Sequence, residues 1–339
     1  MEVNFSNSNS IKMNKIVNNL ITLGIISMIF LAQGCKKGTI PVLTTAEVTV
    51  VTANTAISGG NISDDGGCDI LDKGVCWNKT GDPTINDPKA SSGKGTGSFE
   101  STISGLESGT KYFVRAYASN EPGTAYGETV EFTTKIADID GNLYSFVTIG
   151  TQVWLVENLK TTKLNDNTAI PHVPDNTAWT TLTTSGYAWY NNDEDFNKPI
   201  YGALYNWHAV NSGKLCPSGW HVPTDNEYKT LEQNLGLTPA QLDIWGWRGT
   251  DQGSKIKSTS GWNNGETGNN SSGFTALPGG YRFYGTGGFD GQNTLGYWWT
   301  ASEHDAARAW YRRLDGNNTG IYRASTDKGA GKSVRCVKN

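Results

Sequence analysis

The chain has 339 residues, a formal net charge of −4 and a hydrophobic share of 36%. This length is enough for two domains of ordinary size. The weak negative charge gives no support to nucleic-acid binding, which needs a basic face, so we expect no nucleic-acid partner. Glycine is abundant, with 41 residues, and this favours strands and long loops over helical bundles.

The first 34 residues have the pattern of an export signal. Lys15 precedes an apolar run from Leu20 to Ala32, and the run leads into Gln33-Gly34-Cys35. This ending resembles the lipobox of bacterial lipoproteins, in which the cysteine is lipidated and becomes the first residue. The run is too short for a comfortable membrane span. We therefore expect residues 1–34 to be a lipoprotein signal peptide and Cys35 to carry the lipid.

Residue 36 is Lys rather than Asp, and the resemblance to lipoproteins then favours the outer membrane. The expected location is the cell outer membrane, with a lipid anchor as the link to the membrane. Exposure on the cell surface stays open, and so does the choice between Met1 and Met13 as the start.

Export would place the other four cysteines in an oxidising compartment. An extended strand would hold Cys68 and Cys76 roughly 26 Å apart, beyond the reach of a disulfide unless the chain folds back. We therefore predict a Cys216–Cys336 bond, which would tie the last strand to the middle of its domain. Cys68 and Cys76 are left open, as expected buried thiols.

After a tether at residues 35–44, residues 45–135 are predicted to form an all-β sandwich. Short alternating runs are separated by turn signals such as residues 64–67. The spacing of Leu106 and Tyr112 resembles the corner before a long strand in fibronectin type III domains. Trp77 departs from the usual Trp position of that family. We expect this domain to act as a spacer or adaptor.

Residues 136–339 are predicted to form an α+β domain with long loops. Residues 144–155 indicate a β-hairpin. A helix is predicted after the capping box Thr224-Asp225-Asn226-Glu227, and a second helix start at Thr238-Pro239. Residues 246–296 are rich in Gly, Asn, Ser and Thr and are predicted to be mostly loop. Strands are expected again at residues 297–300, 309–314, 321–323 and 333–337.

Seven motifs of this second domain look, in their order, like the Fibrobacter succinogenes major paralogous domain of bacterial surface and exported proteins. They lie at residues 138–142, 154–160, 202–207, 216–223, 273–282, 298–303 and 333–337. The resemblance implies a C-type-lectin-like fold, shared with formylglycine-generating enzymes, with a twisted mixed sheet and long loops on one side. That family has no generally assigned activity, so the resemblance implies no mechanism.

Catalytic and metal chemistry find little support. The four histidines, His172, His208, His221 and His304, lack metal-ligand spacing. A thiol enzyme would need two reactive cysteines, whereas Cys216 and Cys336 fit a structural bridge. We expect no enzyme activity, no catalytic residue and no cofactor. Calcium stays an alternative for two reasons. Trp262-Asn263-Asn264 resembles in part the Trp-Asn-Asp motif of C-type lectins, and residues 193–195 are acidic.

Aromatic residues punctuate the glycine-rich region, and both sugars and peptide side chains stack on such rings. The competing interpretation is that these rings fix loops onto the core. We predict a binding module for a glycan or an extracellular protein. The alternatives are an enzyme of the formylglycine-generating-like fold and a structural envelope protein without a specific ligand. The expected ligand-binding residues are Trp247, Trp262, Asn263, Asn264, Tyr284 and Phe289.

Overall fold

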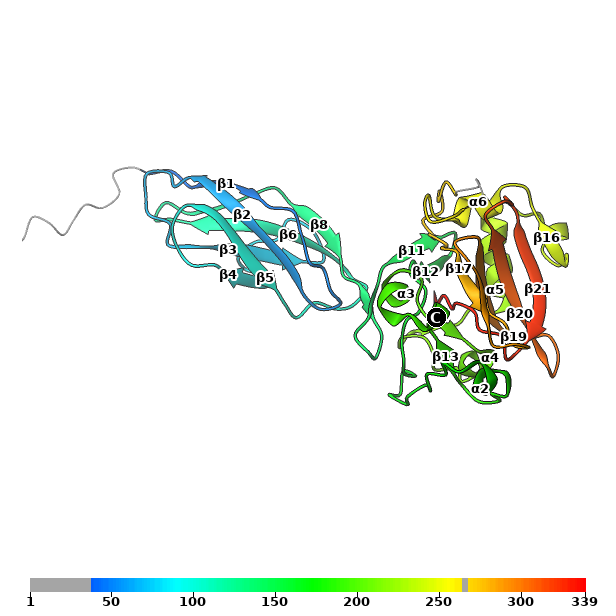
Figure 1. Cartoon of the computed structure of the whole chain (residues 1–339). Helices are drawn as coiled ribbons and strands as arrows, with labels where there is room; N and C mark the ends of the chain where they lie inside the picture. The colour runs from blue at the N-terminus through cyan, green and yellow to red at the C-terminus, as the bar shows by residue number, and fades with distance from the viewer. Residues whose placement is uncertain (1–37, 264–267) are drawn as a thin grey trace, which may run out of the picture. The chain divides into compact units, whose positions relative to one another are not determined.

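The computed structural model describes residues 38–263 and 268–339 (Figure 1). The signal peptide, Cys35 and Asn264 therefore lie outside the described residues. The described chain is mostly β-structure and divides into two compact units. The second unit comprises residues 133–339 and two short segments, 50–56 and 104–111, and the first unit comprises the rest. In the described ranges, no helix has both the length and the apolar character needed to cross a membrane.

The first unit is a sandwich of two sheets. One sheet has the order β1-β2-β5, and the other has the order β4-β3-β6-β7 with β8 also paired to β6. Leu43 and Ile62 of the first sheet pack against Ala116 and Ala118 of the second. The strands are β1 (Val42–Thr45), β2 (Ala56–Asp64), β3 (Asp72–Asn78), β4 (Lys89–Ser91), β5 (Gly97–Ile103), β6 (Lys111–Ser119), β7 (Thr124–Tyr126) and β8 (Val130–Thr133).

Two details of this unit differ from the sequence analysis. Strand β1 begins at Val42, inside the segment expected as a tether, because Leu43 is part of the core. Cys76 is a buried free thiol, as expected, but Cys68 is disulfide-bonded. The expectation of a thiol at Cys68 is wrong because it weighed only Cys76 as a partner, and Cys76 is free. Strand β3 begins only at Asp72, and Cys68 lies in the bend before it.

A six-stranded sheet organises the second unit (Figure 1). Across the sheet its strands are β16 (Gly246–Arg248), β21 (Ile321–Asp327), β20 (Arg308–Asp315), β19 (Leu295–Glu303), β17 (Gly279–Arg282) and β18 (Phe289–Gln292). Strands β17 and β19 are parallel, and the other neighbours are antiparallel. The strands expected near residues 297–300, 309–314 and 321–323 are thus confirmed and are longer than predicted.

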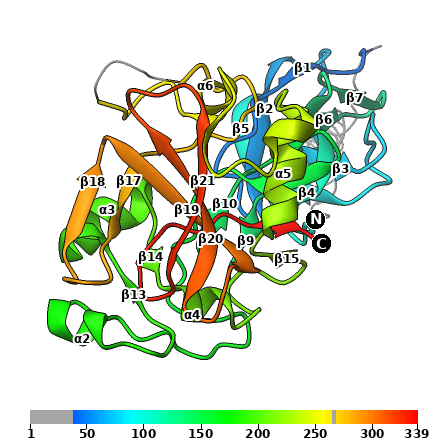
Figure 2. The same ribbon diagram turned by 90° about the vertical axis from the view of Figure 1, so that its right-hand side faces the viewer.

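Helix α5 (Asp225–Asn234) covers one face of this sheet (Figure 2). Its predicted capping box is confirmed, because Thr224 and Glu227 bond each other's backbone N–H groups. Tyr228 and Leu231 of the helix pack with Trp298, Leu314 and Ile321 of the sheet. The second predicted helix start yields only one 3-10 turn, η2 (Pro239–Gln241).

A smaller sheet holds the end of the chain. It has the order β11-β12-β22-β15, from β11 (Phe146–Ile149), β12 (Gln152–Leu155), β22 (Val337–Lys338) and β15 (Trp220–His221). The predicted hairpin is confirmed as β11 and β12. The predicted Cys216–Cys336 disulfide is also present, with Cα atoms 6.1 Å apart. The expected strand 333–337 is shorter in the structure, because Ser333 makes only an isolated bridge to Trp298.

Residues 246–296 are more ordered than predicted. They contain β16, β17, β18 and α6 (Gln252–Ile256), and three of these elements belong to the six-stranded sheet. The prediction of loop is wrong there because glycines interrupt the alternation that marks strands, as in Gly279-Gly280 of β17. The remaining elements are β9 (Ile136–Ala137), β10 (Leu143–Tyr144), α2 (Asn176–Thr180), β13 (Tyr187–Ala188), η1 (Tyr190–Asn192), α3 (Glu194–Ile200), β14 (Leu204–Tyr205) and α4 (Trp207–Val210).

Candidate functional site

A row of large side chains crosses the sheet face opposite α5. Trp247 of β16 lies opposite Tyr322 of β21, Tyr322 opposite Arg313 of β20, and Arg313 opposite Tyr297 of β19. Tyr281 of β17 continues the row, with its ring 4.8 Å from that of Tyr297. Directly opposite residues of neighbouring strands point to the same face. We call these five residues the aromatic row.

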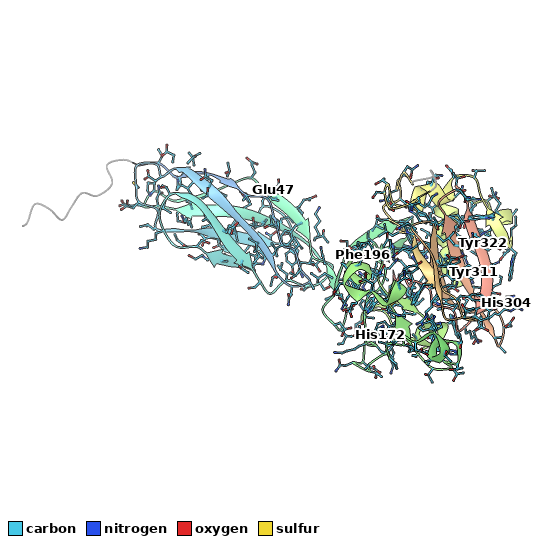
Figure 3. All side chains as sticks on the ribbon, viewed as in Figure 1. Glu47, His172, Phe196, His304, Tyr311 and Tyr322 are labelled. Atoms are coloured by element: carbon cyan, nitrogen blue, oxygen red, sulfur yellow. A yellow bond between two sulfur atoms is a disulfide. The ribbon has the colours of Figure 1, made fainter. Side chains whose placement is uncertain are left out.

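The rings of the row contact one another. The Trp247 and Tyr322 centroids are 5.2 Å apart at 70°, the edge-to-face arrangement that aromatic pairs favour. Tyr311, two residues before Arg313, adds a ring 5.6 Å from Tyr297 and 6.4 Å from Tyr322. Figure 3 labels Tyr311 and Tyr322 on β20 and β21. Trp247 is 37% exposed, so this end of the row faces solvent.

Two cations lie among these rings. The Arg313 guanidinium is within 5.8 Å of the Trp247, Tyr297 and Tyr322 centroids, and its Nε and one terminal nitrogen donate to Asp315. The Lys332 ammonium is 4.3 Å from the centroids of both Tyr297 and Tyr311. Burial, with a smaller contribution from the Arg313 charge, lowers the pKa of Lys332 to about 7. Cation–π contact with several rings favours the charged amine in return.

The opposite face of the sheet is closed by ion pairs. Arg312 donates to Asp225 and Glu232 of α5, and Arg323 donates to Asp225 through two nitrogens. All four side chains are buried. Burial alone would raise the pKa of Asp225, but the hydrogen bonds and charges of Arg323 and Arg312 hold it well below its usual range. This network fixes α5 on that face. On the other face Trp247 is exposed, Tyr322, Arg313 and Tyr281 are partly exposed, and Tyr297 is buried.

A second exposed aromatic group lies at the edge of this opposite face. Trp245, 49% exposed, packs on Trp310 at 5.0 Å and on His304 at 5.5 Å. The Arg323 guanidinium lies 3.6 Å from the Trp310 centroid. Because Trp310 precedes Tyr311, its side chain projects to the other side of β20. Like the row, this group combines exposed aromatic rings with an arginine, but it lies on the other face of the sheet.

The predicted ligand-binding residues do not form one site. Trp247 belongs to the aromatic row. Trp262 is buried, and its Nε1 donates to Ser258 and to the Ala276 carbonyl, so its ring is part of the core. Asn263 is exposed, and its backbone N–H donates to the Asn293 carbonyl. Phe289 packs on the Arg282 guanidinium at 4.6 Å and is partly buried.

Tyr284 lies elsewhere, on the wall of a groove of about 420 Å³. Thr181, His208, Asp327 and Lys328 also line this groove. Burial and the Lys328 charge lower the pKa of His208. The groove is polar. Among the described residues, no acid or base lies within hydrogen-bond distance of the His208 ring, so no pair there indicates catalysis.

Metal ligands are also sparse. In the two described ranges, no group of three or more His, Cys, Asp or Glu side chains could hold a metal ion. In the acidic cluster at residues 193–195, Asp193 accepts from the Phe196 backbone as a helix cap and Glu194 pairs with Lys198. His221 pairs with Glu227, and His304 pairs with Asp305. These contacts are structural pairs of the kind that surface side chains form.

Sequence reasoning missed Tyr297, Tyr311, Tyr322 and Lys332. One signal was available, since Tyr311 and Arg313 occupy alternate positions of a predicted strand and must therefore share a face. For Lys332 there was no signal, because it follows Gly331 in a segment that resembles a loop.

The family model of the Fibrobacter succinogenes major domain matches residues 147–338. A search among curated proteins found no match. Solved structures similar to part of the chain include fibronectin type III domains. A human fourth FNIII domain is 18% identical, covers 32% of this chain and 87% of that chain, and has a TM-score of 0.24. The sensor domain of the anti-sigma factor RsgI4 of Pseudobacteroides cellulosolvens is 14% identical, covers 28% and 95%, and has a TM-score of 0.22.

Proposed function

Since the chain belongs to the Fibrobacter succinogenes major domain family, we propose that the matched unit is a non-catalytic module that binds glycans on its aromatic row. The observation that supports this proposal is the cross-strand register, which aligns Trp247, Tyr322, Arg313 and Tyr297 on four adjacent strands. With Tyr281 on the next strand, the row spans about 19 Å at a strand spacing of about 4.8 Å. This length suits a chain of several sugars.

The chemistry of the row favours a glycan over a protein partner. Sugar rings have an apolar face that stacks on aromatic side chains and a rim of hydroxyl groups that needs hydrogen-bond partners. Besides its aromatic rings, the row carries three tyrosine hydroxyl groups and the Arg313 guanidinium, so it can supply both contacts. A protein interface would instead concentrate its affinity in a compact central cluster of anchors.

The same proposal includes the finer points of the sequence analysis. The second unit has a C-type-lectin-like fold, and the first unit is a spacer. The chain is an outer-membrane lipoprotein anchored through Cys35. The enzyme alternative is disfavoured because both cysteines of the second unit are joined in the Cys216–Cys336 disulfide. A formylglycine-generating type of thiol chemistry would need them reduced and close to a substrate.

The test is binding of the purified chain to a glycan array and to an array of cell-surface proteins. We expect glycan hits that Trp247→Ala weakens about 10- to 30-fold, the effect of removing one exposed aromatic anchor. Trp245→Ala is the matched control, since it removes an exposed Trp from the other face of the sheet and should leave binding unchanged.

Each other result of the two arrays would lead to a different conclusion about the binding site. Hits on proteins alone would replace the glycan by a protein partner. Loss of binding with Trp245→Ala but not with Trp247→Ala would move the site to the opposite face. No hit on either array would support the structural envelope alternative and end the proposal.

A further inference from the structure

Lys332 is a buried amine whose ammonium has no hydrogen-bond partner among the described residues. The residue is 3% exposed. Its backbone N–H and carbonyl are both bonded to Tyr205, so the chain holds it in place. In residues 38–263 and 268–339, no acceptor bonds to its Nζ atom. A buried ammonium that lacks hydrogen-bond acceptors is costly, because water no longer solvates it.

Aromatic rings surround this amine and direct it toward the row. The Nζ atom lies 4.3 Å from the Tyr297 and Tyr311 centroids, 5.2 Å from Trp299 and 5.6 Å from Tyr281. Nζ is not among the polar atoms that the fold encloses completely without a partner. The rings stabilise the positive charge but accept no conventional hydrogen bond. The three N–H groups therefore need acceptors other than those of the described residues, such as those of a bound ligand.

Arg313 contacts the same ring as this amine, since the Tyr297 centroid lies 5.7 Å from the guanidinium and 4.3 Å from the Lys332 ammonium. Nε and Nη2 of Arg313 donate to Asp315, which leaves Nη1 free of bonds to described residues. Among the described residues, the acids that act on Tyr281 and Tyr297 are Asp290 and Asp315. Asp315 is engaged by Arg313, and Asp290 lies at the β18 end, with its carboxylate 3.4 Å from the Tyr281 hydroxyl. The middle of the row is therefore the cationic part.

We propose that the glycan bound by the aromatic row is acidic, with a carboxylate that sits between Lys332 and Arg313. This inference rests on the proposed glycan-binding function and names its substrate class. The carboxylate would accept from the unpartnered ammonium and from the free guanidinium nitrogen, two charge-assisted hydrogen bonds. Neighbouring sugars would stack on Tyr322 and Trp247 toward one end of the row and on Tyr281 toward the other.

The experiment compares acidic sugars with their neutral counterparts by titration calorimetry on the purified full chain. The ligand pairs are oligogalacturonate with its methyl ester, and sialyllactose with lactose. We expect the acidic member of at least one pair to bind at least about tenfold more tightly than its neutral partner. We expect Lys332→Met, which keeps the length of the side chain but not its charge, to remove this preference.

Lys214→Met is the control, since Lys214 is exposed and pairs with Asp166 at the surface; it should not change the preference. Should Lys332→Met fail to fold, Arg313→Gln tests the same contact from the other side and should reduce the preference.

Two results would overturn the inference, and they can be told apart from failure of the proposed function. Equal binding of acidic and neutral members would remove the carboxylate contact and leave glycan binding intact. Absence of binding to any acidic member would also overturn the inference, and the glycan array with Trp247→Ala then decides whether the row binds sugars at all.

Discussion

Removal of the Cys216–Cys336 disulfide should destabilise the second unit strongly. The bond joins positions 120 residues apart. In the chain-entropy treatment, a closed loop of this length restricts the unfolded chain by about 5 kcal/mol at 25 °C. Both cysteines are buried, at 2% and 0% exposure, so a Cys216→Ala/Cys336→Ala variant also loses some packing. Against a typical domain stability of about 5–15 kcal/mol, this is a large share.

Urea denaturation followed by tryptophan fluorescence measures the effect on the second unit. Trp77 is the only one of the 12 tryptophans that lies in the first unit, so the signal reports mainly the second. With a denaturant slope of about 2.5 kcal/mol/M, a loss of about 5 kcal/mol lowers the midpoint by about 2 M.

Cys76→Ala is the control for this experiment. It removes the buried thiol of the first unit and should not move the transition of the second. A midpoint shift below about 0.5 M in the double variant would refute the reasoning, and so would an equal shift in the control.

Two further predictions concern buried groups. Asp225→Asn should remove part of the acid dependence of stability: the pKa of Asp225 is held below its unfolded value, so its contribution is complete near neutral pH and is lost as pH falls. The midpoint temperatures of thermal melts of wild type and variant should then approach each other as the pH is lowered from 7 to 3. A difference that stays constant over this range would contradict the prediction. Burial raises the pKa of the Cys76 thiol to about 11, so iodoacetamide at pH 8 should label it only after urea is added. Rapid labelling of the native chain, read by mass spectrometry, would show that the thiol is accessible.

The features that the sequence predicted well depend on local or covalent rules. The capping box at Thr224 satisfies backbone groups within one turn, so it could be identified without knowledge of the fold. The strands around Tyr311 and Tyr322 were marked by alternation. The Cys216–Cys336 disulfide was predicted because an extended strand would keep Cys68 and Cys76 too far apart to pair. Cys68 lies outside that strand, but the predicted bond is present.

The rest depends on contacts that are distant in sequence. Trp262 was expected as a ligand contact because it stands among glycines, but Ser258 and Ala276 bind its indole N–H and bury it. Lys332 is buried by Tyr281, Tyr297 and Tyr311, which come from three different strands. Only the register of those strands brings the three rings together.

The position of β22 determines when the second unit can close during synthesis. This strand lies between β12 and β15, and Arg335 just before it donates to the Leu155 carbonyl, 180 positions earlier. A growing chain can complete the first unit early, since its strands end at Thr133. Until residues near 337 emerge, β12 and β15 each keep an unpaired edge, a known hazard for aggregation. A premature stop even a few codons before Val337 would therefore release a chain with two open strand edges.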